Sequence, residues 1–285
     1  LTVIGMFTGQ LKYGVDFRGG IETQVRFSKA VGIGEIREKM DASGLQGVSV
    51  QTIGEEGQNE LLIKVSAKDG EINTVSEKIE KILKTEFAAQ GADIRKIDLV
   101  GPKAGNSLRI SGFLAMMWSI ILIMIYVGLR FEFKYAPGVV VALAHDALMV
   151  LAVYEITGTE FTLQTVAAIL TVIGYSVNDT VVVYDRIREN MEKHQGMELK
   201  GIINLAVNET MSRTILTAGT VFIVSVIMFF FGGSAIKDFF MAMTIGVIVG
   251  TYSSIYIASP MTVWLEDTFY SKRGKKGDVS TPASV

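Results

Sequence analysis

The sequence predicts a polytopic α-helical membrane protein with a small α+β domain between its first and second spans. Hydrophobic residues make up 49% of the 285 residues, while charged residues make up 20% and are concentrated in a few segments. Several apolar stretches approach the roughly 20 residues that a membrane helix needs. Residues 21–105 instead show the short hydrophobic periods of a soluble domain. Cysteine is absent, which excludes disulfides and thiolate chemistry.

Residues 1–9, LTVIGMFTG, are predicted to be the end of a first transmembrane helix whose start is missing, because they supply only about half of a span. Residues 10–20 form a linker that contains the motif GVDFRGG. Its glycines permit a tight turn, which favours a structured exit from the membrane over a direct transport role for Asp16. The motif residues are Gly14, Asp16, Phe17, Gly19 and Gly20.

Residues 21–105 are predicted to fold as β-α-β-β-α-β, the ferredoxin-like arrangement. The first strand alternates Ile21, Thr23, Val25 and Phe27 toward one face. The domain contains no His, no Cys and no phosphate-binding loop, so we expect no enzymatic activity, cofactor or metal.

Five further spans are expected within residues 106–265, which makes six with the truncated first one; they cover residues 110–129, 137–157, 162–184, 214–231 and 239–265. Lys and Arg collect in the loop 186–212 and in the tail 266–285, whereas the opposite turns have almost none. Basic loops stay in the cytoplasm. Both termini are therefore expected in the cytoplasm and the soluble domain on the periplasmic or external side of the cytoplasmic membrane.

The span 162–184 carries Asp179, although a carboxylate in a membrane costs about 3 kcal/mol on insertion scales. Helical spacing places Asp179 on a stripe of polar and small residues, which should face protein or water and not lipid; it comprises Gln164, Ala168, Thr171, Tyr175, Asn178 and Asp179.

Arg213 enters the fifth span on a stripe with Glu209, Thr217 and Thr220. Before it, the loop 186–212 is predicted to hold an interfacial helix with an apolar face toward the membrane, made of Ile202, Ile203, Leu205, Ala206 and Val207. Arg213 either reaches lipid phosphates or pairs with Asp179. In the second case the pair keeps the carboxylate ionised and a proton releases the arginine.

The third and sixth spans add further polar residues at membrane depth. His145 and Asp146 form either a secondary proton relay or a packing network, and the same two readings apply to Tyr175, Ser253 and Ser254. Gly246 and Gly250 are typical of close helix packing.

Four motifs together resemble the bacterial SecF family of the Sec protein-export machinery, over nearly the whole chain: GVDFRGG, GYSVNDTVVVYDRIREN, NETMSRTILT and GTYSSIYIASP. The resemblance implies pairing with SecD in a pseudo-symmetric transporter of the RND superfamily, associated with the SecYEG channel and YajC. It also implies use of the proton motive force to complete translocation of an unfolded polypeptide. The family's intramembrane Asp falls on Asp179, with Asn178 and Thr180 beside it, and its Arg falls on Arg213. Membrane lipids, but no nucleic acid, are expected as other partners.

Two alternatives remain open from the residues alone. The chain could be half of an RND-type exporter of small molecules or lipids, although such exporters usually carry both halves in one chain. It could also be a scaffold in which Asp179 and Arg213 form a static ion pair.

Overall fold

The computed structural model describes residues 11–53, 58–68, 70–131, 135–266 and 268. The predicted end of the first span, residues 1–9, lies outside the described residues, as does nearly all of the tail 266–285. The chain divides into two compact units. One comprises residues 1–115, 153–168 and 226–241, and the other residues 116–152, 169–225 and 242–285.

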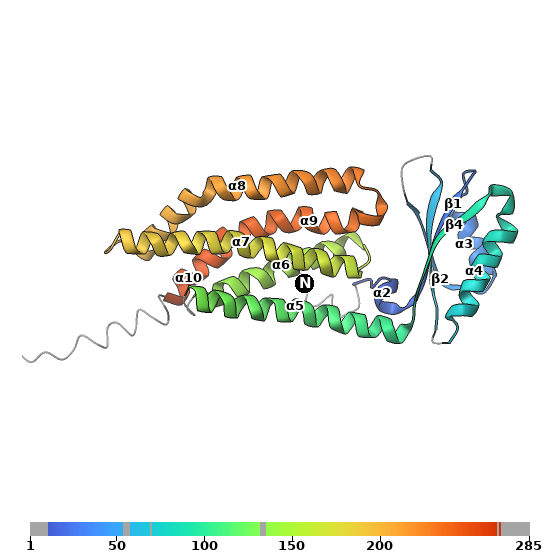
Figure 1. Ribbon diagram of the computed structural model, residues 1–285, viewed down its shortest axis with the longest axis horizontal. Helices are drawn as coiled ribbons and strands as arrows, with labels where there is room; N and C mark the ends of the chain where they lie inside the picture. Colours follow the sequence, from blue (N-terminus) through green and yellow to red (C-terminus); the bar gives the residue numbers. More distant parts are fainter. Residues whose placement is uncertain (1–10, 54–57, 69, 132–134, 267, 269–285) are drawn as a thin grey trace, which may run out of the picture. The chain divides into compact units, whose positions relative to one another are not determined.

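The first unit contains an antiparallel sheet of four strands in the order β2-β3-β1-β4. The strands are β1 (Gly20–Phe27), β2 (Gln46–Ile53), β3 (Glu60–Ser66) and β4 (Ala92–Val100). Helices α3 (Ile33–Ala42) and α4 (Ile72–Glu86) lie on one face of this sheet, and a short 3₁₀ turn, η1 (Ala88–Gln90), precedes β4 (Figure 1). Strands and helices follow each other in the order expected from the sequence.

Alternation along β1 explains why the sheet has a single buried face. Ile21 and Val25 are fully buried and point with Phe27 into a core shared with both helices. Side chains of a strand point to opposite faces in turn. The hydrophobic positions therefore select the face that α3 and α4 cover, and the core includes Ile36, Met40, Ile63, Ile79, Leu83 and Phe87.

The rest of the chain is helical and polytopic. Its long helices are α5 (Pro102–Arg130), α6 (Ala136–Thr157), α7 (Leu163–Lys193), α8 (Leu199–Phe231) and α9 (Ser234–Ser253). The last continues through a π-helical turn, η2 (Ser254–Ala258), into α10 (Ser259–Leu265). By length and composition, five helical segments of the described chain can cross a membrane. The protein is therefore a helical membrane protein.

The predicted loop 186–212 is wrong in its extent, because α7 and α8 both continue into it as helix. Only residues 194–198 separate them. An ion pair and a hydrogen bond join the two extensions: Arg186 Nε donates to Glu209 Oε2 across 2.7 Å, and Asn190 Nδ2 donates to the same oxygen across 2.7 Å. Such bonds, and the Glu189–Lys193 pair at i,i+4, support helix outside an apolar segment.

The predicted apolar face of that loop is also wrong in part. Ile202, Ile203 and Ala206 are buried within the protein and do not face the membrane. They belong to the uninterrupted helix α8, whose 33 residues make it about 50 Å long at 1.5 Å per residue. A helix of that length exceeds the thickness of a bilayer core, so part of it extends beyond the core.

Candidate functional site

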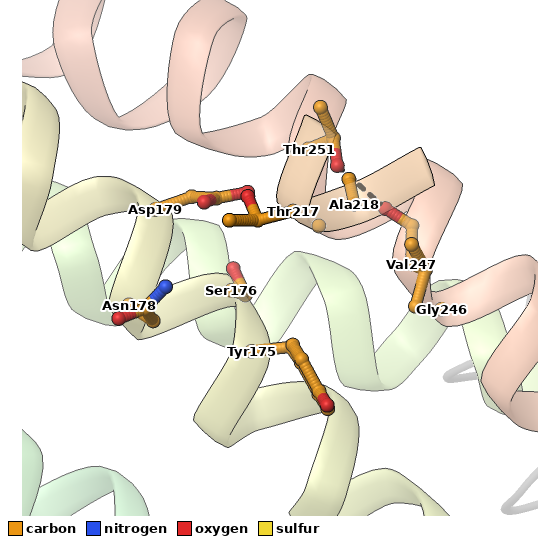
Figure 2. A pocket seen from close by; sticks show the side chains of 10 residues that line it. Tyr175, Ser176, Asn178, Asp179, Thr217, Ala218, Gly246, Val247 and Thr251 are labelled. Carbon is orange, nitrogen blue, oxygen red and sulfur yellow. Dashed lines mark hydrogen bonds between the residues drawn. The ribbon is translucent and has the colours of Figure 1, made fainter. Parts of the chain in front are cut away.

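Asp179 lies on α7 with only 8% of its surface exposed. Its carboxylate points toward Thr217 of α8 (Figure 2). Both residues line a cavity of about 20 Å³. That volume is enough for one water molecule. The remaining lining comes from α7, α8 and α9 and includes Tyr175, Ser176, Asn178, Gly246, Gly250 and Thr251.

The residues of the predicted polar stripe on α7 do not share one environment. Ala168 and Asp179 are buried, whereas Gln164, Tyr175 and Asn178 are exposed on this chain. The inward face of α7 is instead formed by apolar residues that continue into Ser176, Asp179 and Thr180. Residues spaced three or four apart lie on roughly the same side of a helix. The edge of the buried face of α7 runs through this set of residues, so some are buried and others are exposed.

Arg213 lines a different cavity, of about 460 Å³, at the charged ends of α7 and α8. Within the described residues, no salt bridge of 4.0 Å or less joins Arg213 to Asp179. The guanidinium charge still acts on Asp179 across the longer distance. The two residues are thus electrostatic neighbours without a direct bond, and Thr217, one helical turn after Arg213, is the nearer group to the carboxylate.

Thr180 is not among the residues that line the Asp179 cavity, and its hydroxyl connects helices. Its hydroxyl donates to the Ser176 carbonyl across 3.0 Å and shares a 2.8 Å hydrogen bond with the Ser254 hydroxyl. Ser254 also donates to the Gly250 carbonyl. These contacts join α7 to η2 at the point where the π turn begins.

Asp146 of α6 is fully buried. Its Oδ2 accepts hydrogen bonds from Ser176 Oγ across 2.6 Å and from Ser253 Oγ across 2.8 Å, and its Oδ1 lies 3.1 Å from His145 Nδ1. We did not expect Ser176 to take part. The available signal was its place three residues before Asp179, which puts both side chains on one face of the helix.

Gly246 and Gly250 allow α9 to approach α7 closely, as the small-residue pattern predicts. A Cβ at Gly246 would lie 2.2 Å from Val172 Cγ2, and one at Gly250 would lie 3.1 Å from Ser176 Cβ. Close approach brings Ser253 to Asp146, so these glycines set the geometry of the buried hydroxyls.

The motif GVDFRGG belongs to the first unit and forms the short helix α2 (Val15–Arg18) with its flanking glycines. Asp16 Oδ2 accepts a 3.0 Å hydrogen bond from the backbone N–H of Leu163, the first residue of α7. Phe17 is buried and stacks on Phe161. Gly19 has φ +80° and would place a Cβ 2.7 Å from the Pro102 backbone, while a Cβ at Gly20 would lie 2.5 Å from the Val65 carbonyl.

These contacts give Asp16 a structural use, since helix N-termini have unpaired N–H groups and a positive end of the helix dipole. We expect Asp16→Ala to lower the free energy of unfolding by about 1 kcal/mol, the usual cost of losing such a cap. Asp16→Asn keeps an acceptor oxygen and should cost less. Thermal unfolding of the purified protein in detergent measures both.

Asp41→Ala, at an exposed site on α3, is the matched control and should leave the unfolding temperature unchanged. If Asp16→Ala were equally stable but impaired in transport, Asp16 would act in transport and not as a cap.

Known protein families match the regions of the chain that contain these motifs. The family model "Protein export membrane protein SecD/SecF, C-terminal" matches residues 78–268, and the model "SecD/SecF GG Motif" matches residues 4–31, which include Gly19 and Gly20. The protein translocase subunit SecF of Desulfurispirillum indicum is 39% identical over 281 residues, covering 97% of this chain and 89% of that protein. The SecF subunit of Rickettsia bellii is 40% identical over 267 residues, covering 93% and 87%.

Two solved structures are similar across most of the chain. The crystal structure of SecDF from Thermus thermophilus superposes with a TM-score of 0.79 at 32% identity, covering 93% of this chain and 36% of that one. SecDF in its super-membrane-facing form gives a TM-score of 0.70 at 30% identity, covering 96% and 37%. The chain thus spans most of the length of its SecF relatives and little more than a third of SecDF. It belongs to the SecF family of protein translocase subunits, within the SecD/SecF family of protein export membrane proteins.

Proposed function

We propose that this chain is one half of a proton-driven complex that promotes late-stage translocation of unfolded proteins across the cytoplasmic membrane, with SecD as the other half. The observation that carries the proposal is the buried carboxylate of Asp179 beside a water-sized cavity in a membrane helix. Such a group is costly in a membrane and typically marks a path for ions or protons. Asn178 and Thr180 hold the flanking positions of the helix, and Arg213 supplies the nearby positive charge.

The energy available matches such a role. Moving one charge through 100 mV releases about 2.3 kcal/mol, which shifts a two-state equilibrium by about fifty-fold. Protonation of Asp179 removes the negative charge that Arg213 acts on. Release of the proton on the other side of the membrane restores it. A change in the Asp179–Arg213 interaction is therefore our proposed link between proton movement and helix movement.

The topology that fits this role has six spans, with residues 1–9 as the end of the first. The four-stranded sheet with two helices, residues 21–105, is a ferredoxin-like domain on the periplasmic or external side, where translocated polypeptide emerges. Arg186 and Lys193 near the end of α7 and Lys200 near the start of α8 favour a cytoplasmic position for those ends. Both termini are then cytoplasmic, and residues 266–285 form a basic cytoplasmic tail.

The exposed polar side chains of α7 support a protein partner inside the membrane. Tyr175 is 42% exposed and Asn178 is also exposed, although both belong to a membrane-crossing helix. Polar groups at that depth face protein or water. We assign this face to SecD, which would complete the surroundings of Asp179, with SecYEG and YajC as more distant partners in the same machinery.

Cross-linking tests that assignment cleanly, because the chain has no native cysteine. We expect Tyr175→Cys and Asn178→Cys to form cross-links to SecD through a short thiol-reactive linker in native membranes. Ile169→Cys, on the buried face of the same helix, should form none. If the two exposed positions reacted with membrane-soluble maleimides but never with SecD, the face would contact lipid and the assignment would be wrong.

Deletion of the chain tests the proposed function as a whole. Export into inverted membrane vesicles should lose the part that depends on a proton gradient and keep the part that ATP alone drives. Re-expression should restore the lost part. Normal export combined with new sensitivity to small toxic compounds would instead favour an RND-type exporter.

A further inference from the structure

Asp146 is a fully buried carboxylate with polar partners on three helices. The three helices each place one polar side chain within hydrogen-bond distance of its carboxylate. His145 precedes it on α6, Ser176 approaches from α7 and Ser253 approaches from α9. Among the described residues, His145 is the only titratable side chain within ion-pair distance of Asp146. The other two neighbours are neutral hydroxyls, which can both give and accept hydrogen bonds.

Both protonation states of Asp146 find partners in this arrangement. The ionised form accepts from both serines, and His145 can donate to its second oxygen. The neutral form becomes a donor itself, and a serine oxygen can accept from it. Ser253 then has another acceptor ready, because its hydroxyl lies 3.1 Å from the Gly250 carbonyl. Neither state leaves a buried polar group without a hydrogen-bond partner, which would be destabilising.

Ser176 connects this site with Asp179. Its hydroxyl donates to Asp146 Oδ2, and the same residue lines the cavity that Asp179 lines (Figure 2). One water molecule fits in that cavity. Such a water could donate to the Ser176 oxygen while the Ser176 proton is directed at Asp146. The pathway then runs from Asp179 through water and Ser176 to Asp146, and on to His145, whose side chain is 31% exposed.

We propose that Asp146 is a second proton-binding site of the transport cycle, which exchanges a proton with Asp179 through Ser176. In each transfer from Asp179 to Asp146, the water takes the proton of Asp179 and gives one of its own to Ser176. Ser176 gives its hydroxyl proton to Asp146, so the water and the hydroxyl are both unchanged at the end. This inference rests on the proposed proton-driven function.

The two serines provide a matched test, since both are buried and each donates one hydrogen bond to the same oxygen of Asp146. Only Ser176 also lines the Asp179 cavity. If Asp146 takes part in proton transfer, Ser176→Ala should remove most gradient-driven export in vesicles that contain the intact complex, while Ser253→Ala retains most of it. If Asp146 only packs helices, the two variants should lose export equally or not at all, and the proposal fails.

Infrared titration of the purified, lipid-reconstituted complex gives an independent readout. We expect two buried carboxyl groups that change protonation with pH, one absent in Asp179→Asn and the other absent in Asp146→Asn, with the second perturbed by Ser176→Ala. Ser225→Ala replaces a buried serine whose hydroxyl donates to the Phe222 carbonyl of the same helix, and it should leave the spectrum unchanged. A spectrum of Asp146→Asn identical to the wild type would overturn the proposal. Normal gradient-driven export by Asp179→Asn would instead refute the proposed function itself.

Discussion

Asp179→Asn is expected to abolish the gradient-dependent part of protein export while the complex still assembles. Asn has nearly the shape of Asp and can occupy the same place beside Thr217, so the packing of α7 and α8 should persist. It carries no ionisable proton at any relevant pH. Export should therefore fall to the level measured without a proton gradient, and the ATP-driven early stage should continue.

The measurement compares export into inverted vesicles with and without a proton ionophore. Asp185→Asn is the matched control on the same helix, since Asp185 is an exposed carboxylate that lies 3.5 Å from Arg130. Exposed ion pairs contribute little, so this variant should respond to the ionophore like the wild type. A full response in Asp179→Asn would remove the basis for assigning proton coupling to this residue.

The second large effect concerns the contact between α7 and α9. Gly246→Ala would place a methyl group 2.2 Å from Val172 Cγ2, a distance that forces the helices apart. Overpacking of a tight contact typically costs about 1–3 kcal/mol. Because the same contact holds Ser253 and Ser176 at Asp146, we expect both the unfolding temperature and gradient-driven export to fall.

Val172→Ala offers a specific rescue. The double variant Gly246→Ala with Val172→Ala removes the clashing methyl groups and should recover stability relative to Gly246→Ala alone. Gly219→Ala is the control within a helix, because a Cβ there meets no atom within 4 Å. If Gly246→Ala were as stable as Gly219→Ala, the helices would not need close contact at this position.

Local patterns in the sequence were sufficient for much of the fold. The alternation of Ile21, Val25 and Phe27 predicts the buried face of β1, and the structure buries all three. Long apolar runs likewise predict five membrane-crossing helices within the described chain. The sequence could not show where α7 ends and α8 begins, since the charged residues Arg186 and Glu209 stabilise helix there through a contact between segments 23 residues apart.

Local sequence patterns also predicted part of the candidate site. Burial of Asp179 follows from its depth in an apolar run, and the close packing at Gly246 follows from the small-residue pattern. The spacing of Ser176 from Asp179 indicates which face of α7 it occupies, but its bond to Asp146 depends on the packing of α6 against α7, which no periodicity within one helix reveals. Helical periodicity also placed Tyr175 on the same stripe as Asp179, although Asp179 is buried and Tyr175 is exposed in the structure.

Proton movement during export tests the role of Asp179 most directly. The complex can be reconstituted in vesicles that contain a pH-sensitive dye, and proton flux recorded while a precursor protein is translocated. We predict export-coupled proton flux in the wild type and in Asp185→Asn, and none in Asp179→Asn. Undiminished flux in Asp179→Asn would contradict the assignment of this carboxylate as the proton carrier.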